Sequence, residues 1–347
     1  MLDRSGVEGH EQQRIWFSTA LVRGRLATSF LFVGPSGIGK RTFARMLAKS
    51  LLCRNTAATE LDCCCHCEDC AQVEASTHPD LIQVSKPEDK AYLPIELLIG
   101  EREKRMREGL CHDISLKPWG GRRKIAILDD ADTLNTEGAN SLLKTLEEPP
   151  VNSMLILVGT SLQKQLPTIR SRCQSIVFKK LENENLTNLI LANDLAETNE
   201  AAEVLAANAK GSLARAAQVA DPELQQFFAD MLPLLVARQL DIVELAKQIG
   251  AAVDSVGKEG RLKRERLKLI LQFTADFYRA IALDLTETAN QPEYVVRATK
   301  SWLERRNHDT ASALKLWNRC LTAIEEVDRN ANQASLLAAW SSDLSLA

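Results

Sequence analysis

A glycine-rich stretch at residues 34–42, Gly-Pro-Ser-Gly-Ile-Gly-Lys-Arg-Thr, constrains the fold more than any other part of the chain. An apolar run precedes it and a run with helical spacing follows, so the pattern predicts a strand, a tight turn and a helix. Gly34, Gly37 and Gly39 let successive backbone N–H groups point into one concavity. Lys40 adds a full positive charge at the helix N-terminus. The pattern indicates a phosphate loop, the alternative being a tight strand-to-helix turn without a ligand.

The hydroxyl residue that should follow the lysine of a phosphate loop is displaced by one position. Arg41 stands where the pattern places the serine or threonine that binds magnesium, and Thr42 comes one place late. One residue along a helix is a rotation of about 100°. We therefore expect Thr42 to point away from the metal position, in a nucleotide-binding fold whose own catalytic site is damaged.

An acidic pair follows an apolar run at residues 125–128 and fits the second half of a phosphate-loop site. Asp129 is expected to hold magnesium or its water, and Asp130 stands where a glutamate usually polarises the attacking water. Asp130 is one methylene shorter than that glutamate, which is a second weakness of the site. A later buried strand ends in Thr160 and Ser161, whose hydroxyls can face the phosphates.

A cysteine cluster is the second strong signal, because six of the nine cysteines lie between residues 53 and 70. Three of them have zinc-ligand spacing, and one more lies upstream. The interleaved Cys63, Cys65 and His66 leave the ligand set open, as does the alternative of free, redox-labile thiols. The favoured ligands of a closed, structural zinc site are Cys53, Cys64, Cys67 and Cys70.

Composition sets the broader limits. At 347 residues the chain is long enough for two or three domains, with the apolar content of 45% and charged content of 26% of an ordinary soluble protein. The formal net charge of −3 means that any contact with nucleic acid must use a local basic patch. We expect no signal peptide, because residues 1–13 are polar, and no membrane span. A cytoplasmic location is expected, where thiols stay reduced.

The remaining patterns predict further elements along the chain. His10 is either the start of a helix or a ligand contact, and three tryptophans near the C-terminus are expected in a helix-bundle core. The predicted helices cover residues 11–23, 43–52, 94–108 and 140–148, then short segments in 182–220 and most of 221–345. The predicted strands cover residues 30–33, 81–84, 125–128, 154–160 and 175–178. The tryptophans are Trp302, Trp317 and Trp340.

Taken in order, these motifs resemble bacterial clamp-loader subunits of the AAA+ class, in particular the delta-prime subunits of DNA polymerase III. The resemblance covers roughly residues 7–215, and the C-terminal third agrees only in length and helical character. The motifs that carry it are residues 9–11, 34–40, the cysteine cluster with His78-Pro79-Asp80, 129–132, 140–150 and Ile169-Arg170-Ser171-Arg172-Cys173.

The resemblance implies an α/β fold in three parts. An AAA+ phosphate-loop domain with a parallel sheet spans residues 1–180 and contains an inserted zinc module at about 53–80. A small helical lid follows at 181–220, and an all-helical collar at 221–347 joins a hetero-pentameric ring of subunits.

The resemblance also implies a function. Arg172 acts as an arginine finger that reaches a neighbour's ATP, while Ala214 stands where motor subunits carry a sensing arginine, with Arg215 one place late. We expect a stator that does not hydrolyse ATP itself but helps load a sliding clamp onto primed DNA. Its expected partners are gamma/tau-type and delta-type subunits, the clamp indirectly and primer-template DNA, with no membrane. Zinc is the expected structural cofactor. Weak ATP binding through Lys40 remains open, and magnesium is needed only if ATP binds.

Two alternatives stay in view. The chain is an ATP-hydrolysing gamma/tau-type motor of the same ring, which Lys40 and Asp129 favour and Arg41 and Ala214 oppose. Otherwise it is a zinc-dependent nucleic-acid adaptor that uses the cysteine cluster. The adaptor ranks last because acidic residues surround the cluster, whereas a DNA-facing zinc module should be basic.

Overall fold

The structure of the chain is a computed structural model that describes residues 7–57, 61–87, 90, 92–257, 259–283, 293–305 and 309–346. Parts of three predicted regions lie outside the described residues: 1–6 of the polar N-terminus, 58–60 of the zinc module, and 284–292 and 306–308 of the collar. By its internal contacts the chain divides into two compact units, Met1–Asn193 with Ala209–Arg215, and Asp194–Asn208 with Ala216–Ala347. The predicted lid contributes to both units, and the three-part division stays a prediction.

The first unit is built on a five-stranded sheet in which every pair of neighbouring strands is parallel, as predicted. Its three central strands are buried along their whole length and almost entirely apolar, which is the pattern of a sheet covered by helices on each side. The strands, in the spatial order β2-β3-β4-β1-β5, are β1 (Ser29–Val33), β2 (Leu81–Val84), β3 (Lys124–Leu128), β4 (Ser153–Gly159) and β5 (Gln174–Val177).

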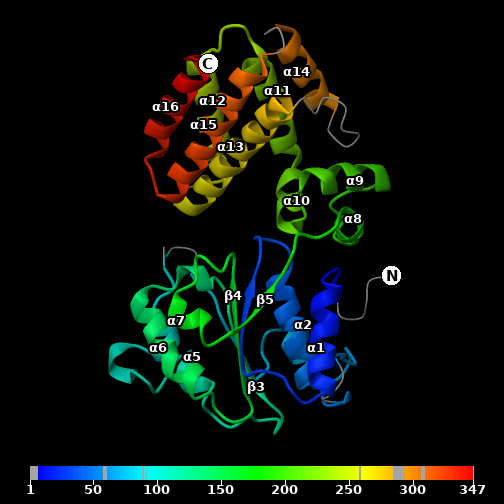
Figure 1. The fold of residues 1–347 in the computed structure, drawn as a ribbon, viewed down its shortest axis with the longest axis vertical. Helices are drawn as coiled ribbons and strands as arrows, with labels where there is room; N and C mark the ends of the chain where they lie inside the picture. Colours follow the sequence, from blue (N-terminus) through cyan, green and yellow to red (C-terminus); the bar gives the residue numbers. More distant parts are fainter. Residues whose placement is uncertain are drawn as a thin grey trace. The chain divides into compact units, whose positions relative to one another are not determined.

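Helices cover both faces of this sheet. Figure 1 shows α1 and α2 on one face and α5, α6 and α7 on the other, with a separate hydrophobic core beneath each group. The helices of this unit are α1 (Glu11–Val22), α2 (Lys40–Leu52), α3 (Glu68–Glu74), α4 (Glu96–Ile99), α5 (Leu110–Asp113), α6 (Thr136–Glu147), α7 (Pro167–Arg170) and α8 (Asn183–Ala192). Short 3-10 turns occupy Arg102–Lys104 and Ala131–Thr133.

The helix predicted over residues 94–108 is wrong. α4 ends at Ile99 because Gly100 adopts a φ of 81°, a left-handed conformation that does not continue an α-helix. The N–H of Met106 then returns to the carbonyl of Ile99 at 2.6 Å, so the chain folds back as a compact loop. A Cβ at Gly100 would lie 2.9 Å from the Lys104 carbonyl oxygen, which makes glycine necessary at this turn.

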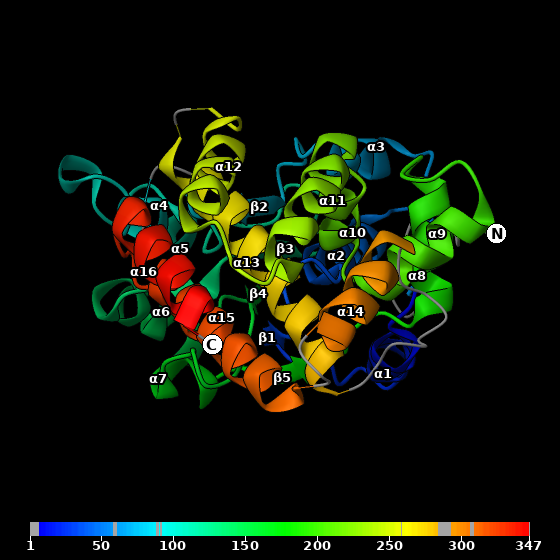
Figure 2. The same ribbon diagram turned by 90° about the horizontal axis from the view of Figure 1, so that it is seen from above.

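The second unit is helical, as predicted. Aspartates begin three of its helices: the side chains of Asp221, Asp241 and Asp309 accept hydrogen bonds from the first-turn N–H groups of α11, α12 and α15. α13 packs along α15 in both views of the ribbon (Figures 1 and 2). The helices after α8 are α9 (Asn199–Asn208), α10 (Leu213–Val219), α11 (Pro222–Val236), α12 (Ile242–Asp254), α13 (Gly260–Ala282), α14 (Glu293–Arg305), α15 (Thr310–Asp328) and α16 (Gln333–Leu346).

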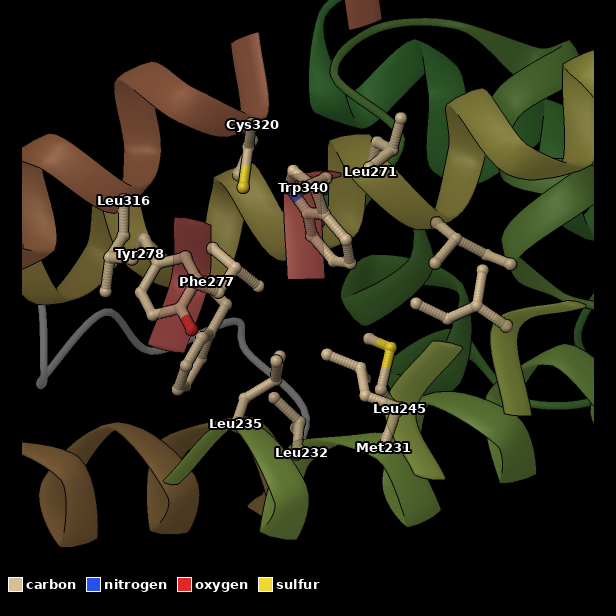
Figure 3. Close-up of a cluster of buried hydrophobic side chains, with 14 of the residues drawn as sticks. Met231, Leu232, Leu235, Leu245, Leu271, Phe277, Tyr278, Leu316, Cys320 and Trp340 are labelled. Atoms are coloured by element: carbon tan, nitrogen blue, oxygen red, sulfur yellow. The ribbon is translucent and has the colours of Figure 1, made fainter. Parts of the chain in front are cut away.

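One large core holds this helical unit together. Figure 3 shows its centre, where Trp340 of α16 lies among side chains from α11, α12, α13 and α15. Trp302 and Trp340 are fully buried and the partly buried Trp317 packs against the same hydrophobic cluster, so these tryptophans belong to the helix-bundle core, as predicted. Among the described residues, no helix combines the length and apolar character needed to cross a membrane.

We expect Trp340→Ala to lower the free energy of unfolding of the helical unit by about 3–5 kcal/mol, because it leaves a cavity in a core that cannot fully collapse. Denaturant unfolding followed by far-UV circular dichroism measures the change. Trp119→Ala is the matched control: Trp119 is 86% exposed, and its loss should change the free energy by less than about 0.5 kcal/mol. Equal effects of the two substitutions would contradict this account of the core.

Candidate functional site

The predicted phosphate loop connects β1 to α2 at the carboxyl edge of the sheet. Gly37 and Gly39 have φ angles of 73° and 94°, so the loop uses left-handed conformations that favour glycine. Lys40 begins α2 and is buried, and its Nζ donates to the carbonyls of Gly34 and Pro35 at 2.8 and 2.6 Å. Burial lowers the pKa of Lys40, and the nearby carboxylates of the acidic strand end oppose this shift. The lysine is thus held by its own loop.

A segment distant in sequence packs directly on this loop. The N–H of Leu213 donates to the carbonyl of Gly37 at 3.0 Å. A Cβ added at Gly37 would lie 2.3 Å from Ser212 Oγ and 2.7 Å from Ala214 Cβ, so only glycine permits this approach. Ala214, which the sequence placed at the position of a sensing arginine, therefore lies against the loop as a small packing residue.

His10, just before α1, also contacts the backbone of this loop. It precedes α1 with a φ of 62°, and its Nε2 lies 2.8 Å from the carbonyl oxygen of Ile38. Its ring meets Phe178 edge-on, with the centroids 4.9 Å apart. Burial lowers the pKa of His10, which favours the neutral ring. Of the two roles that the sequence left open, the structure places His10 at the helix start and against the loop backbone.

The acidic end of β3 also lies at this edge, where Arg41 meets it. Arg41 Nη1 lies 3.5 Å from Asp129 Oδ2, while the backbone N–H of Asp130 donates to Asp129 Oδ1 at 3.0 Å. Burial raises the pKa of Asp129 and the Asp130 charge adds to the shift, whereas Arg41 and Lys40 lower it. Both oxygens of Asp129 thus have partners within the chain.

This arrangement does not fit a magnesium ion held by Asp129 and a loop hydroxyl. A positively charged guanidinium already lies beside the carboxylate, and Thr42 is exposed. Mg²⁺ requires oxygen ligands in near-octahedral geometry, and a neighbouring cation adds repulsion. The structure therefore brings Lys40, Arg41 and Asp129 together as a set of internally compensated charges.

Asp132 is a residue of this edge whose role sequence reasoning missed. One carboxylate oxygen accepts the backbone N–H of Thr160 at 2.7 Å, and the other accepts a hydrogen bond from the Gln165 side-chain amide. A Cβ at Gly159 would meet both of these side chains. Asp132 thus fixes the end of β4 and the position of Thr160. The Asp-Asp-Ala-Asp sequence could have signalled a third carboxylate, but it does not indicate the partners.

Arg172, the predicted arginine finger, lies just after α7 with one third of its side chain exposed. Its Nε and Nη2 both contact Glu147 Oε1, at 2.8 and 2.5 Å. Its Nη1 donates to the carbonyl of Thr168 and to Ser171 Oγ, each at 3.1 Å. The guanidinium is therefore ordered at the surface, with Glu147 as its charged partner.

The four favoured cysteines converge into one cluster, in which all sulfur atoms lie within 4.8 Å of one another. Cys53 Sγ lies 3.6 Å from Cys64 Sγ and 3.8 Å from Cys67 Sγ, and Cys64 and Cys70 are separated by 3.9 Å. A tetrahedral zinc with Zn–S bonds of about 2.3 Å needs sulfur separations of about 3.8 Å. The donor set and its spacing fit a closed structural zinc site.

Backbone N–H groups donate hydrogen bonds to the sulfur atoms of this cluster and so favour the thiolate form. Cys64, Cys67 and Cys70 donate their N–H groups to the sulfurs of Cys53, Cys64 and Cys67 at 3.5, 3.3 and 3.4 Å. Burial acts to raise the pKa of Cys53, but hydrogen bonds from the surrounding chain lower it to about 6. Arg122 donates to the carbonyls around Cys53, one of them at 2.5 Å, and so ties the cluster to the loop before β3.

The interleaved residues that the sequence left open lie outside this group of four. Cys63 and Cys65 face each other with their sulfurs 3.2 Å apart, and the His66 ring contacts the carbonyl of Cys64. Burial raises the pKa of Cys63 to about 12. Among the described residues, the metal-compatible cysteine group is the set that the sequence favoured.

Comparisons with known proteins show which family the chain resembles. The sequence profile of the family described as "DNA polymerase III, delta subunit" matches residues 9–182, half of the chain. The delta' subunit of DNA polymerase III from Pseudomonas aeruginosa is 38% identical over 162 residues, 47% of this chain and 46% of that protein. The tau subunit from Escherichia coli K12 is 32% identical over 224 residues, 62% of this chain and 32% of that protein. The chain thus spans less than half the length of either relative.

The solved structure of a DNA polymerase III, gamma subunit-related protein from Thermotoga maritima is also similar. It aligns with 95% of this chain and 98% of its own, with a TM-score of 0.40 and 13% identity. The region matched by the family profile contains the phosphate loop, the cysteine cluster and Arg172. This chain belongs to the DNA polymerase III delta-subunit family.

Proposed function

We propose that this chain is a non-catalytic, stator-like subunit of the DNA polymerase III clamp loader. In this proposal it helps to load a sliding clamp onto primed DNA and supplies Arg172 to the ATP site of a neighbouring subunit. Family membership supports the assignment to this assembly. The stator role rests on the geometry of the phosphate loop.

The observation that carries the stator role is the ion pair between Arg41 and Asp129. In phosphate-loop ATPases a hydroxyl after the lysine and an acidic strand end hold magnesium, which neutralises charge on the transferred phosphate. Here the guanidinium of Arg41 lies beside the acidic group instead. A side chain that is part of the loop cannot bridge the phosphates as magnesium does, so hydrolysis on this chain loses its main electrophile.

The same loop bears on nucleotide binding. Lys40 is present, but its ammonium group already contacts two loop carbonyls, and Leu213 and Ser212 lie against Gly37. ATP must break several of these contacts to enter. We therefore propose that ATP binding to this chain is weak or absent and that the loop serves as a rigid part of the fold.

Arg172 has the chemistry of an arginine finger. Its guanidinium is permanently charged, partly exposed and aligned by three neighbouring residues. Such a group, supplied from a second chain, stabilises the charge that develops on the γ-phosphate of a bound ATP. We propose that Arg172 completes a site whose other residues belong to a gamma/tau-type neighbour.

The rest of the chain is assigned in the same proposal. The sheet unit corresponds to an AAA+ domain, residues 181–220 to its lid and the C-terminal helices to a collar in a ring of five subunits. Delta-type subunits, the sliding clamp and primer-template DNA are the other proposed partners. A cytoplasmic location follows, because bacterial DNA replication takes place there.

The cysteine cluster supplies a proposed structural zinc site. Cys53, Cys64, Cys67 and Cys70 would hold the ion, and four thiolates leave no open position for catalysis. Arg122, through its bonds to the chain around Cys53, connects this site to the loop before β3. The zinc would thus stabilise the insertion after α2.

A gamma/tau-type motor remains the second candidate, since the tau subunit of Escherichia coli matches 62% of this chain and both Lys40 and Asp129 are present. ATP turnover by the isolated chain distinguishes the two functions. A stator shows none above background, whereas a motor shows turnover that Lys40→Ala abolishes.

We expect Arg172→Ala to reduce ATP turnover of the reconstituted clamp loader while leaving its assembly intact. An arginine finger contributes about 10³-fold or more to the rate at the site that it completes. Total ATP turnover should therefore fall by nearly the whole contribution of the site that Arg172 completes. Steady-state ATPase assays and size-exclusion chromatography measure the two properties.

Arg170→Ala is the matched control for this test, because Arg170 is an exposed arginine on the same turn. Turnover with this variant should equal that of the unaltered complex. If Arg172→Ala leaves turnover unchanged, Arg172 is not the finger. If the isolated chain hydrolyses ATP, the stator role is wrong.

We expect one zinc ion per chain, and Cys67→Ser should reduce the bound zinc because a serine hydroxyl is a poor replacement for a thiolate ligand. Elemental analysis of the purified chain measures the stoichiometry. Cys65→Ser is the control, since this exposed cysteine lies outside the group of four. Loss of zinc from the Cys65 variant, but not from the Cys67 variant, would identify a different ligand set.

A further inference from the structure

The hydrogen bonds of Arg172 leave little of its guanidinium available. All three nitrogens of the guanidinium have partners within this chain. Nε donates to Glu147 Oε1, Nη2 lies 2.5 Å from the same oxygen, and Nη1 donates to the carbonyl of Thr168 and to Ser171 Oγ. An incoming phosphate that uses the Nε and Nη2 edge must therefore replace Glu147 there.

We propose that Glu147 holds Arg172 on its own chain and competes for it with the γ-phosphate of the neighbouring subunit's ATP. This inference rests on the proposed function of Arg172. Glu147 is then a positioning residue. It holds the Arg172 guanidinium in a contact within this chain until a nucleotide-bound neighbour docks. Thr168 and Ser171 continue to orient Nη1 when Nε and Nη2 exchange one acceptor for the other.

The position of Glu147 supports a role beyond stabilising its helix. It is the last residue of α6, where the negative end of the helix dipole disfavours a carboxylate. Pro149 and Pro150 follow, so the helix cannot continue past this point. Glu147 is thus best explained by its contact with Arg172, which lies 25 residues further along the chain.

The strength of the pair suits an exchangeable contact. The side chains of Arg172 and Glu147 are 33% and 49% exposed, and pairs exposed to this degree are weak and screened by salt. A terminal phosphate carries more charge than a carboxylate and offers three acceptor oxygens, where Glu147 uses a single oxygen. The phosphate can therefore displace Glu147, while water alone leaves the pair in place.

The buried neighbours of Arg172 confine the exchange to its side chain. Ile169 and Cys173 flank the finger and are buried at 1% and 8% exposure. They anchor the backbone on both sides, so the loop need not unfold for Arg172 to change partners. The exchange therefore changes only the acceptor at Nε and Nη2, from Glu147 to the phosphate.

The test compares the reconstituted clamp loader containing Glu147→Gln with the unaltered complex, using ATP and magnesium as the probe. Glutamine keeps the size of the side chain but removes its charge. We expect kcat/KM for ATP to rise about two- to fivefold, the range that corresponds to releasing an exposed ion pair. The rise should come from a lower KM with kcat unchanged, because the pair is already broken once ATP is bound.

Glu148→Gln is the matched control, since it removes the same charge one residue later, where the structure shows no pair with Arg172. It should leave both constants unchanged, and subunit assembly and far-UV circular dichroism should be unaltered in both variants. If Glu147→Gln behaves like the control or lowers kcat/KM, competition by Glu147 is wrong.

Arg172→Ala in the same assay separates this inference from the proposed function. Loss of turnover with Arg172→Ala, together with no effect of Glu147→Gln, contradicts only the role of Glu147. No effect of Arg172→Ala contradicts the finger and, with it, the competition. The double variant should match Arg172→Ala alone, because Glu147 acts through Arg172.

Discussion

The parallel pairing of β1 with β4 on one side and β5 on the other is the constraint on which the site depends. This pairing buries β1 completely and fixes the point at which the phosphate loop leaves the sheet. The first residue beyond β1 must be glycine, because a Cβ at Gly34 would lie 2.3 Å from the carbonyl oxygen of Phe178 after β5. The position of the loop is therefore set by the apolar core, independently of any ligand.

Because the loop is fixed, the pairing of its charged groups determines whether it can bind a magnesium nucleotide. Lys40 donates to loop carbonyls and lies near carboxylates. Asp129 is paired with Arg41 and accepts a hydrogen bond from an N–H group, and Asp132 accepts hydrogen bonds from groups at the end of β4. A buried charge is costly unless it is paired and hydrogen-bonded, so these contacts keep the edge of the sheet stable without a ligand. A magnesium nucleotide would have to replace several satisfied contacts at once.

Local sequence predicted the parts of this arrangement that depend on neighbouring residues. The strands, the loop and the convergence of four cysteines follow from short patterns, and the parallel sheet and helical C-terminal unit were correctly predicted. The helix over residues 94–108 failed because charge spacing does not reveal that Gly100 takes a positive φ. The contacts of Asp132 with the end of β4, and of Glu147 with Arg172, span 25 to 33 residues. No local pattern specifies such partners, so only the folded chain reveals them.

Lys40 and Arg172 differ in burial, and this difference determines which of the two cationic groups remains accessible. Lys40 is 7% exposed and its Nζ donates to two loop carbonyls, so its ammonium group is already used to hold the loop. The guanidinium of Arg172 keeps its charge, and a third of its side chain is open to solvent beside one exchangeable carboxylate. In the proposed function, a phosphate of a neighbouring subunit gains more by replacing that surface partner than by opening the buried loop. The fold thus keeps the ammonium group of Lys40 in contacts within its own loop, while the guanidinium of Arg172 stays partly exposed at the surface.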